Sequence, residues 1–255
     1  MKSGDFVTRM SYKNDIVFRI LKIKDNTAII KGEEIRLIAD SPIKDLVPYE
    51  DKIVVNLPKL IVKNDNRNLN GKVLHLDGDP YYLKKAMEAY SFYNIKAQGY
   101  YLKEYDMRFG VIDLLKKDNF DILVLTGHDS YQTNNKLENN NLTSYRNSYH
   151  YLLAVAETRK FYPNKDNLVI VAGACQSNYE ALIESGANFA SSPNRKNIHL
   201  LDPIIIASTV ALTRTSEYID VQKMLNSTIS LEMGGIETKG KARRCFLGGK
   251  RSVDG

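Results

Sequence analysis

From residue 71 onward, apolar runs alternate with segments of helical spacing. Four runs predict strands: KVLHLD, NIKAQGYYL, FDILVLTG and NLVIVAG. Strands that are apolar along most of their length and separated by helices are typical of a parallel sheet covered on both faces. We therefore predict an α/β domain over residues 71–255.

Between and after these runs, apolar residues recur three and four positions apart. This spacing predicts helices in YYLKKAMEAYSFYN, MRFGVIDLLKKDN, SYRNSYHYLLAVAETRKFY, CQSNYEALIESG and TSEYIDVQKMLNSTIS. Thr215 or Ser216 is the expected N-cap of the last helix. ANFASSP and DPIIIAST are predicted as shorter strands.

Residues 4–49 have a different pattern, in which short runs of Val, Ile and Phe in near alternation are broken by Gly, Asn, Asp and Pro. This pattern predicts short antiparallel strands, and we expect a small SH3-like β-barrel domain over residues 1–50. The polar, Asn-rich segment KNDNRNLNG lies within residues 51–70, which we predict to be a linker.

Composition excludes several classes of protein. The formal charge is +6 but the lysines are scattered, which favours a solvated basic surface over a specific nucleic-acid site. No run approaches the roughly 20 apolar residues of a membrane helix, and the polar N-terminus lacks the apolar run of a secretory signal. Two distant cysteines, Cys175 and Cys245, form neither a disulfide framework nor a zinc cluster. We expect a protein without metal or organic cofactor that works in the compartment where it is made.

Reactive residues follow two of the predicted strands. His128 ends DILVLTGHD and Cys175 ends NLVIVAGAC. Ligands of parallel sheets lie beyond the carboxyl ends of the strands, so both side chains are expected at one edge. An imidazole beside a thiol takes or shares its proton, and a following helix N-terminus would stabilise the thiolate. Backbone N–H groups near both residues would hold an oxyanion.

Structural roles compete with this interpretation. A single Cys or His at a strand end is more often a packing or satisfied structural residue, and only their coincidence at neighbouring strand ends brings the two interpretations level. Asp77 and Asp79 either orient the imidazole, bind a basic substrate, or form a turn and cap the next helix. His75, inside an apolar run, is expected to be structural, and Cys245 incidental.

Longer segments resemble the family of sporulation-specific YabG proteases of spore-forming bacteria. They include GDFVTRMSYKNDIVFRI, EEIRLIADSPIKDLV, GKVLHLDGDPYYLKK, DILVLTGHDSY and LVIVAGACQSNYEALIESGANFASSPNRKNIHLLDP, and the resemblance covers nearly the whole chain. The strands ending in His and in Ala-Cys are also similar to those of caspase-, clostripain- and gingipain-type cysteine peptidases. The resemblance implies a caspase/clostripain-like α/β fold, with Asp129 in place of that group's usual Gly.

The resemblance implies a cysteine endopeptidase with a His128/Cys175 dyad and an oxyanion site made of the N–H groups of Asp129 and Cys175. It implies cleavage after Arg, for which Asp77, Asp79 and Glu180 are candidate acidic contacts. Self-cleavage is a further hypothesis, which the positions of Arg67 in the polar linker and Arg146 beyond the Asn-rich loop motivate. The expected substrates are spore-coat and related spore proteins. The expected location is the cytoplasm of the sporulating cell, mother cell or spore, followed by association with the spore or coat.

Two other functions remain open. The chain would be a non-catalytic module for binding or assembling the spore coat if the thiol proved inert. A serine or metal hydrolase is less favoured, because the chain lacks a Gly-x-Ser-x-Gly elbow and a cluster of metal ligands.

Overall fold

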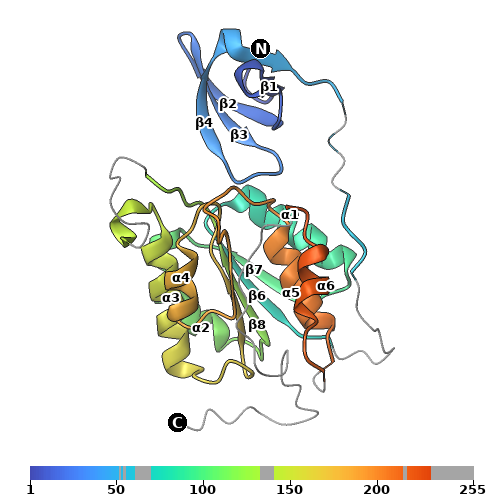
Figure 1. The fold of residues 1–255 in the computed structure, drawn as a ribbon, viewed down its shortest axis with the longest axis vertical. Helices are drawn as coiled ribbons and strands as arrows, with labels where there is room; N and C mark the ends of the chain where they lie inside the picture. The colour runs from blue at the N-terminus through green and yellow to red at the C-terminus, as the bar shows by residue number, and fades with distance from the viewer. Residues whose placement is uncertain (52, 54–55, 61–69, 133–140, 215–216, 231–255) are drawn as a thin grey trace. The chain divides into compact units, whose positions relative to one another are not determined.

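The computed structural model describes residues 1–51, 53, 56–60, 70–132, 141–214 and 217–230. The chain divides into two compact units, Met1–Leu57 and Pro58–Gly255 (Figure 1). Most of the predicted linker and the cysteine at position 245 lie outside the described residues.

The first unit is an antiparallel sheet of five strands in the order β4-β3-β2-β1-β5. Its elements are β1 (Phe6–Arg9), η1 (Met10–Tyr12), β2 (Phe18–Lys24), β3 (Thr27–Gly32), β4 (Ile38–Pro42), η2 (Ile43–Asp45) and β5 (Leu46–Pro48). Alternate apolar side chains of these strands form one small core, which contains Val7, Phe18, Ile20, Ala28, Ile30 and Leu46. The expected antiparallel strands are present, and β5 is an additional strand that pairs with β1.

The second unit contains a parallel sheet of five strands in the order β10-β9-β8-β6-β7. Its strands are β6 (Val73–Asp77), β7 (Ala97–Tyr101), β8 (Ile122–Thr126), β9 (Val169–Ala172) and β10 (Phe189–Ala190). Every residue of β6, β8 and β9 is buried, which is why these strands show no polar alternation. The predicted parallel α/β sheet is confirmed.

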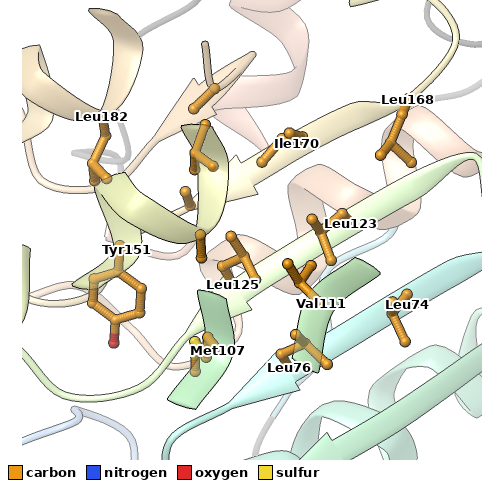
Figure 2. Packing of buried hydrophobic residues seen from close by; sticks show 14 of the residues in the cluster. Leu74, Leu76, Met107, Val111, Leu123, Leu125, Tyr151, Leu168, Ile170 and Leu182 are labelled. Carbon is orange, nitrogen blue, oxygen red and sulfur yellow. The ribbon is translucent and has the colours of Figure 1, made fainter. Parts of the chain in front are cut away.

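Helices cover both faces of this sheet (Figure 1). The described helices of this unit are α1 (Pro80–Phe92), α2 (Glu104–Leu115), η3 (Leu142–Ser144), α3 (Ser148–Phe161), α4 (Tyr179–Glu184), α5 (Asp202–Leu212) and α6 (Val221–Asn226). Helices α2, α3 and α4 pack on one face, where Met107, Val111, Tyr151 and Leu182 meet the strand side chains (Figure 2). Helices α1 and α5 contact the strands from the other face.

Two predictions near the end of the chain were wrong. DPIIIAST is not a strand but the first part of α5, whose residues from Asp202 to Ala211 are all buried. A continuous apolar run has no period that separates a buried helix from a buried strand, so hydropathy alone misassigned it. The last helix begins later than expected, at Val221, and Asp220 caps it; the proposed caps at 215 and 216 lie outside the described residues.

Candidate active site

The carboxyl ends of three adjacent strands carry the candidate residues. Strand β6 ends at Asp77, β8 leads into His128, and β9 leads into Cys175. The chain leaves β6 toward β7 on one side, whereas β8 lies on the other side, so the strand order reverses between β6 and β8. Ligand sites of open α/β sheets lie at such a reversal, beyond the carboxyl ends of the strands.

The imidazole of His128 is held by a carboxylate. Its Nε2 lies 2.7 Å from Oδ2 of Asp79, and the side chain is 18% exposed. Since a carboxylate only accepts, Nε2 carries the proton and Nδ1 is left as the acceptor. The other oxygen of Asp79, Oδ1, accepts the N–H of Tyr81 at 2.9 Å and caps α1. Asp79 therefore caps a helix and orients the imidazole at the same time.

The backbone of His128 is fixed as well. Its N–H donates to Oε1 of Glu104 at 2.8 Å, and its carbonyl accepts from Nδ2 of Asn147 at 2.8 Å. A Cβ on Gly127 would lie 2.4 Å from Oε1 of Glu104 and 2.6 Å from the hydroxyl oxygen of Tyr151. A glycine at 127 is therefore needed for the close approach of these two side chains to the loop.

The thiol of Cys175 is covered. The residue is 2% exposed, its Sγ–H donates to the carbonyl of Ile198 at 3.6 Å, and its Sγ accepts the N–H of Ile198 at 3.4 Å. The following helix α4 starts only at Tyr179, and the side chain of Asn178 caps it. The sulfur therefore lies before the helix N-terminus and not at it, and the helix begins later than the expected position near Ser177, because the chain first makes a turn through Gln176 (φ +59°).

The carboxylate of Asp129 is buried and accepts four hydrogen bonds. Oδ1 accepts the N–H groups of Ser130 (2.9 Å) and Asn147 (2.8 Å), and Oδ2 accepts the hydroxyls of Ser148 (2.5 Å) and Ser177 (2.9 Å). Burial raises the pKa of this carboxyl above its usual value, although each hydrogen bond acts in the opposite direction. The side chain thus faces the protein interior, whereas the backbone N–H of Asp129 donates to no group within the described part of the chain.

A second buried network lies behind Asp79. Thr126 donates its hydroxyl to Oδ2 of Asp77 at 3.0 Å, and Oδ1 of Asp77 accepts the N–H of Asp79 at 2.9 Å. His75 is completely buried, with its two ring nitrogens 3.1 Å from the hydroxyls of Thr126 and Tyr90. Asp77 is also completely buried. Because its carboxylate accepts the N–H of Asp79, it fixes the turn that carries Asp79.

Glu180 is the exposed member of the three candidate acidic contacts. It forms an ion pair with Arg195, and its side chain is 49% exposed. Arg195 Nε also donates to the hydroxyl of Tyr145 at 2.6 Å. The loop that contains Arg195 is the one that brings Ile198 onto Cys175.

Sequence patterns did not identify several residues that hold the site. They are Glu104, Asn147, Ser148, Gln176 and Ser177. Only Gln176 and Ser177 carried a signal, their positions directly after the candidate nucleophile. The others lie at the starts of α2 and α3, and only the packing of these helices on the sheet brings them to the strand ends.

Neither a metal site nor a membrane span was found in the part of the chain that the structure describes. No group of three or more His, Cys, Asp or Glu side chains there is arranged to hold a metal ion. No described helix is both long and apolar enough to cross a membrane.

Comparison with known proteins identifies a family model and a relative that match most of the chain. The family model described as YabG peptidase U57 matches residues 2–70 and 59–246. The sporulation-specific protease YabG of Bacillus subtilis (strain 168) is 40% identical, over 94% of this chain and 96% of the relative. No solved structure matches the chain.

Proposed function

This chain belongs to the YabG peptidase family, and we propose that it is a sporulation-specific cysteine endopeptidase that uses His128 and Cys175. The family membership confirms the resemblance noted in the sequence and makes peptide-bond hydrolysis the expected activity. The observation that carries the cysteine mechanism is an imidazole, oriented by Asp79, at a strand end adjacent to the one that carries the thiol.

In the proposed reaction, Nδ1 of His128 accepts the thiol proton and Sγ of Cys175 attacks the substrate carbonyl carbon. The carbonyl oxygen becomes an oxyanion, for which the N–H groups of Asp129 and Cys175 are the proposed donors. When the C–N bond breaks, the imidazolium returns the proton to the leaving amine. Water then hydrolyses the thioester and frees the thiol. The N–H of Asp129 suits this role because no described group accepts it.

We propose spore-coat and related spore proteins as substrates, cut after Arg. Of the acidic candidates, Asp77 and Asp79 have internal hydrogen-bond donors, whereas Glu180 is half exposed and already binds a guanidinium within the chain. Glu180 is therefore the acidic side chain with the best access to a substrate arginine. Self-cleavage, action in the sporulating cell and later association with the coat complete the proposal.

The finer fold assignments are part of the same proposal. The five antiparallel strands of the first unit suit a small SH3-like barrel. The parallel sheet, with His after one strand and Cys after the next, suits the caspase/clostripain type.

Cleavage by matched cysteine variants tests the proposal. Purified wild-type, Cys175→Ala and Cys245→Ala proteins are incubated with spore-coat extract and with arginine-containing fluorogenic peptides. We expect Cys175→Ala to lose at least about a thousandfold in rate, as enzymes do without their nucleophile, and Cys245→Ala to remain active. Full activity of folded Cys175→Ala would refute the cysteine mechanism.

One observation favours the alternative of a non-catalytic coat-binding module. The thiol is 2% exposed and hydrogen-bonded to Ile198, so a peptide reaches it only when the loop containing Ile198 moves. If wild-type and Cys175→Ala proteins bind coat extract equally and neither cleaves it, the binding module is the correct function.

A further inference from the structure

The carboxylate of Asp129 joins the two loops that carry the proposed dyad. Asp129 follows His128 directly, and its Oδ2 accepts the hydroxyl of Ser177, two residues after Cys175. The same Ser177 hydroxyl oxygen accepts the N–H of Ala174 at 2.9 Å, so the contact reaches both sides of the nucleophile.

A parallel connection runs through the start of α3. The hydroxyl of Ser148 donates to Oδ2 of Asp129 at 2.5 Å and accepts the N–H of Asn178 at 2.7 Å. Two serine hydroxyls therefore link one carboxylate oxygen to backbone N–H groups on either side of Cys175. Both serines are buried, as is Asp129, so these contacts lie where water competes least.

We propose that Asp129 is a positioning residue that fixes the spacing of His128 and Cys175 through Ser177 and Ser148. This inference rests on the proposed dyad. It assigns the side chain a task separate from that of the backbone N–H at the same position. Reactive groups lose rate steeply when they move by about 1 Å, so the link should act on the chemical step more than on substrate binding.

Steady-state kinetics of Asp129→Asn test this role. Asparagine keeps the size of the side chain and one acceptor oxygen, but places an NH2 group toward the two serine hydroxyls. With a peptide that wild-type protein cleaves and Cys175→Ala does not, we expect kcat to fall about a hundredfold and KM to change less than about threefold. Ser177→Ala should lower kcat less, and the double variant should be no slower than Asp129→Asn alone, because both changes break one connection.

Asp121 supplies the matched control at the opposite end of β8. It is also a buried carboxylate, and it accepts a backbone N–H, that of Lys72 at 2.9 Å, far from the dyad loops. Asp121→Asn should lower the melting temperature and leave kcat per folded molecule unchanged. If Asp129→Asn behaves like Asp121→Asn, or if its effect adds fully to that of Ser177→Ala, the positioning role is wrong. Activity in Cys175→Ala would instead refute the dyad itself.

A different observation concerns residues 192–198, which we call the cover. Ile198 contributes both backbone hydrogen bonds to the sulfur. The N–H of Gln176 donates to the Ser192 hydroxyl and to the carbonyl of Lys196, each at 3.1 Å, so the cover is fastened to the residue after the nucleophile. Ser192 and Arg195 both have positive φ, which shapes the cover as a tight turn.

Arg195, at the middle of the cover, holds it in place through an ion pair and hydrogen bonds. Its guanidinium pairs with Glu180 of α4 and donates to the Tyr145 hydroxyl, and it also donates to the carbonyl of Pro193 within the cover at 3.0 Å. We infer that the cover shields the thiol of Cys175 from solvent and substrate, and that the contacts of Arg195 hold the cover in this position. A substrate arginine that binds Glu180 would displace Arg195. Under the proposed preference for Arg, substrate binding would then release the cover and expose the thiol.

Thiol alkylation measures the cover without any need for cleavage. In a Cys245→Ser background, iodoacetamide modifies only Cys175, and intact mass reports the rate. We expect Arg195→Ala to raise that rate about tenfold, the effect of losing a charge-assisted hydrogen bond, while Lys72→Ala, which breaks an ion pair with Asp118, leaves it unchanged. The cover is refuted if the wild-type thiol reacts as fast as in urea-unfolded protein, or if Arg195→Ala reacts at the wild-type rate. Either result leaves the cleavage test of the dyad unaffected.

Discussion

The loops after β8 and β9 lie at one edge of the sheet but hold their reactive side chains differently. His128 is partly exposed and has its charged partner, Asp79, in place at 2.7 Å. Cys175 is closed off, and its sulfur is occupied by the backbone of Ile198. In the proposed mechanism, the side of the site that carries His128 is therefore ready for acid–base chemistry in this conformation, whereas the side that carries Cys175 must open before the thiol can attack a peptide.

The largest expected effect on activity comes from a change beside His128. Asp79→Asn should lower kcat about a thousandfold, because an amide beside Nε2 favours the wrong tautomer of His128, as in other triads. Asparagine caps helices as well as aspartate does, so α1 should keep its N-cap and the melting temperature should change little. Steady-state kinetics and thermal unfolding of the same sample measure both. A loss of less than about tenfold would mean that Asp79 only caps the helix.

Two glycine-to-alanine variants, one in each loop, should differ in whether they lower stability or activity more. Gly173 after β9 has φ +105°, and a Cβ there would lie 2.9 Å from Cδ1 of Leu182, so Gly173→Ala should lower the free energy of unfolding by about 3 kcal/mol. Gly127 after β8 has no positive φ, and a Cβ would displace the flexible end of Glu104. Gly127→Ala should therefore cost less stability but lower kcat, since the His128 N–H loses its acceptor.

Urea unfolding and kinetics of both variants check this contrast. Equal losses of stability would contradict the different reasons given for the two glycines. Unchanged kcat in folded Gly127→Ala would show that Glu104 does not position the histidine loop.

The position of His128 and its carboxylate could be predicted from the sequence better than the burial of Cys175 under the cover. Apolar runs fix where buried parallel strands end, so His128, Cys175 and Asp79 could be assigned to one edge. The cover could not be predicted, because the contact of Ile198 with Cys175 spans 23 residues and depends on turns at Ser192 and Arg195 that hydropathy does not encode. The inward orientation of the Asp129 side chain could not be predicted for the same reason, since its serine partners come from the start of α3 and from the turn before α4.

Two histidines, one on each side of the site, extend the comparison to proton binding. His128 is partly exposed beside a carboxylate, whereas His199, which follows Ile198 of the cover, is 6% exposed. Burial, with a smaller contribution from the charge of Lys85, lowers the pKa of His199 from 6.5 to about 4. Its Nδ1 accepts the N–H of Leu201 at 3.2 Å, which requires an unprotonated nitrogen. A neutral imidazole therefore forms a hydrogen bond in the chain directly after the cover.

The smallest expected effect is a loss of stability in acid through His199. Between pH 6.5 and 4 the unfolded chain binds a proton that the folded protein does not, so the free energy of unfolding falls as the pH falls through this window. We expect a contribution of about 2 kcal/mol, below the full value of the shift because the ring is not wholly desolvated. His199→Asn keeps an acceptor for Leu201 but does not titrate, and the acidic groups are the same in both proteins. The difference in urea-unfolding free energy between wild type and His199→Asn should therefore shrink from pH 7 to pH 4, and a difference that stays constant would show that His199 is free to protonate in the closed conformation.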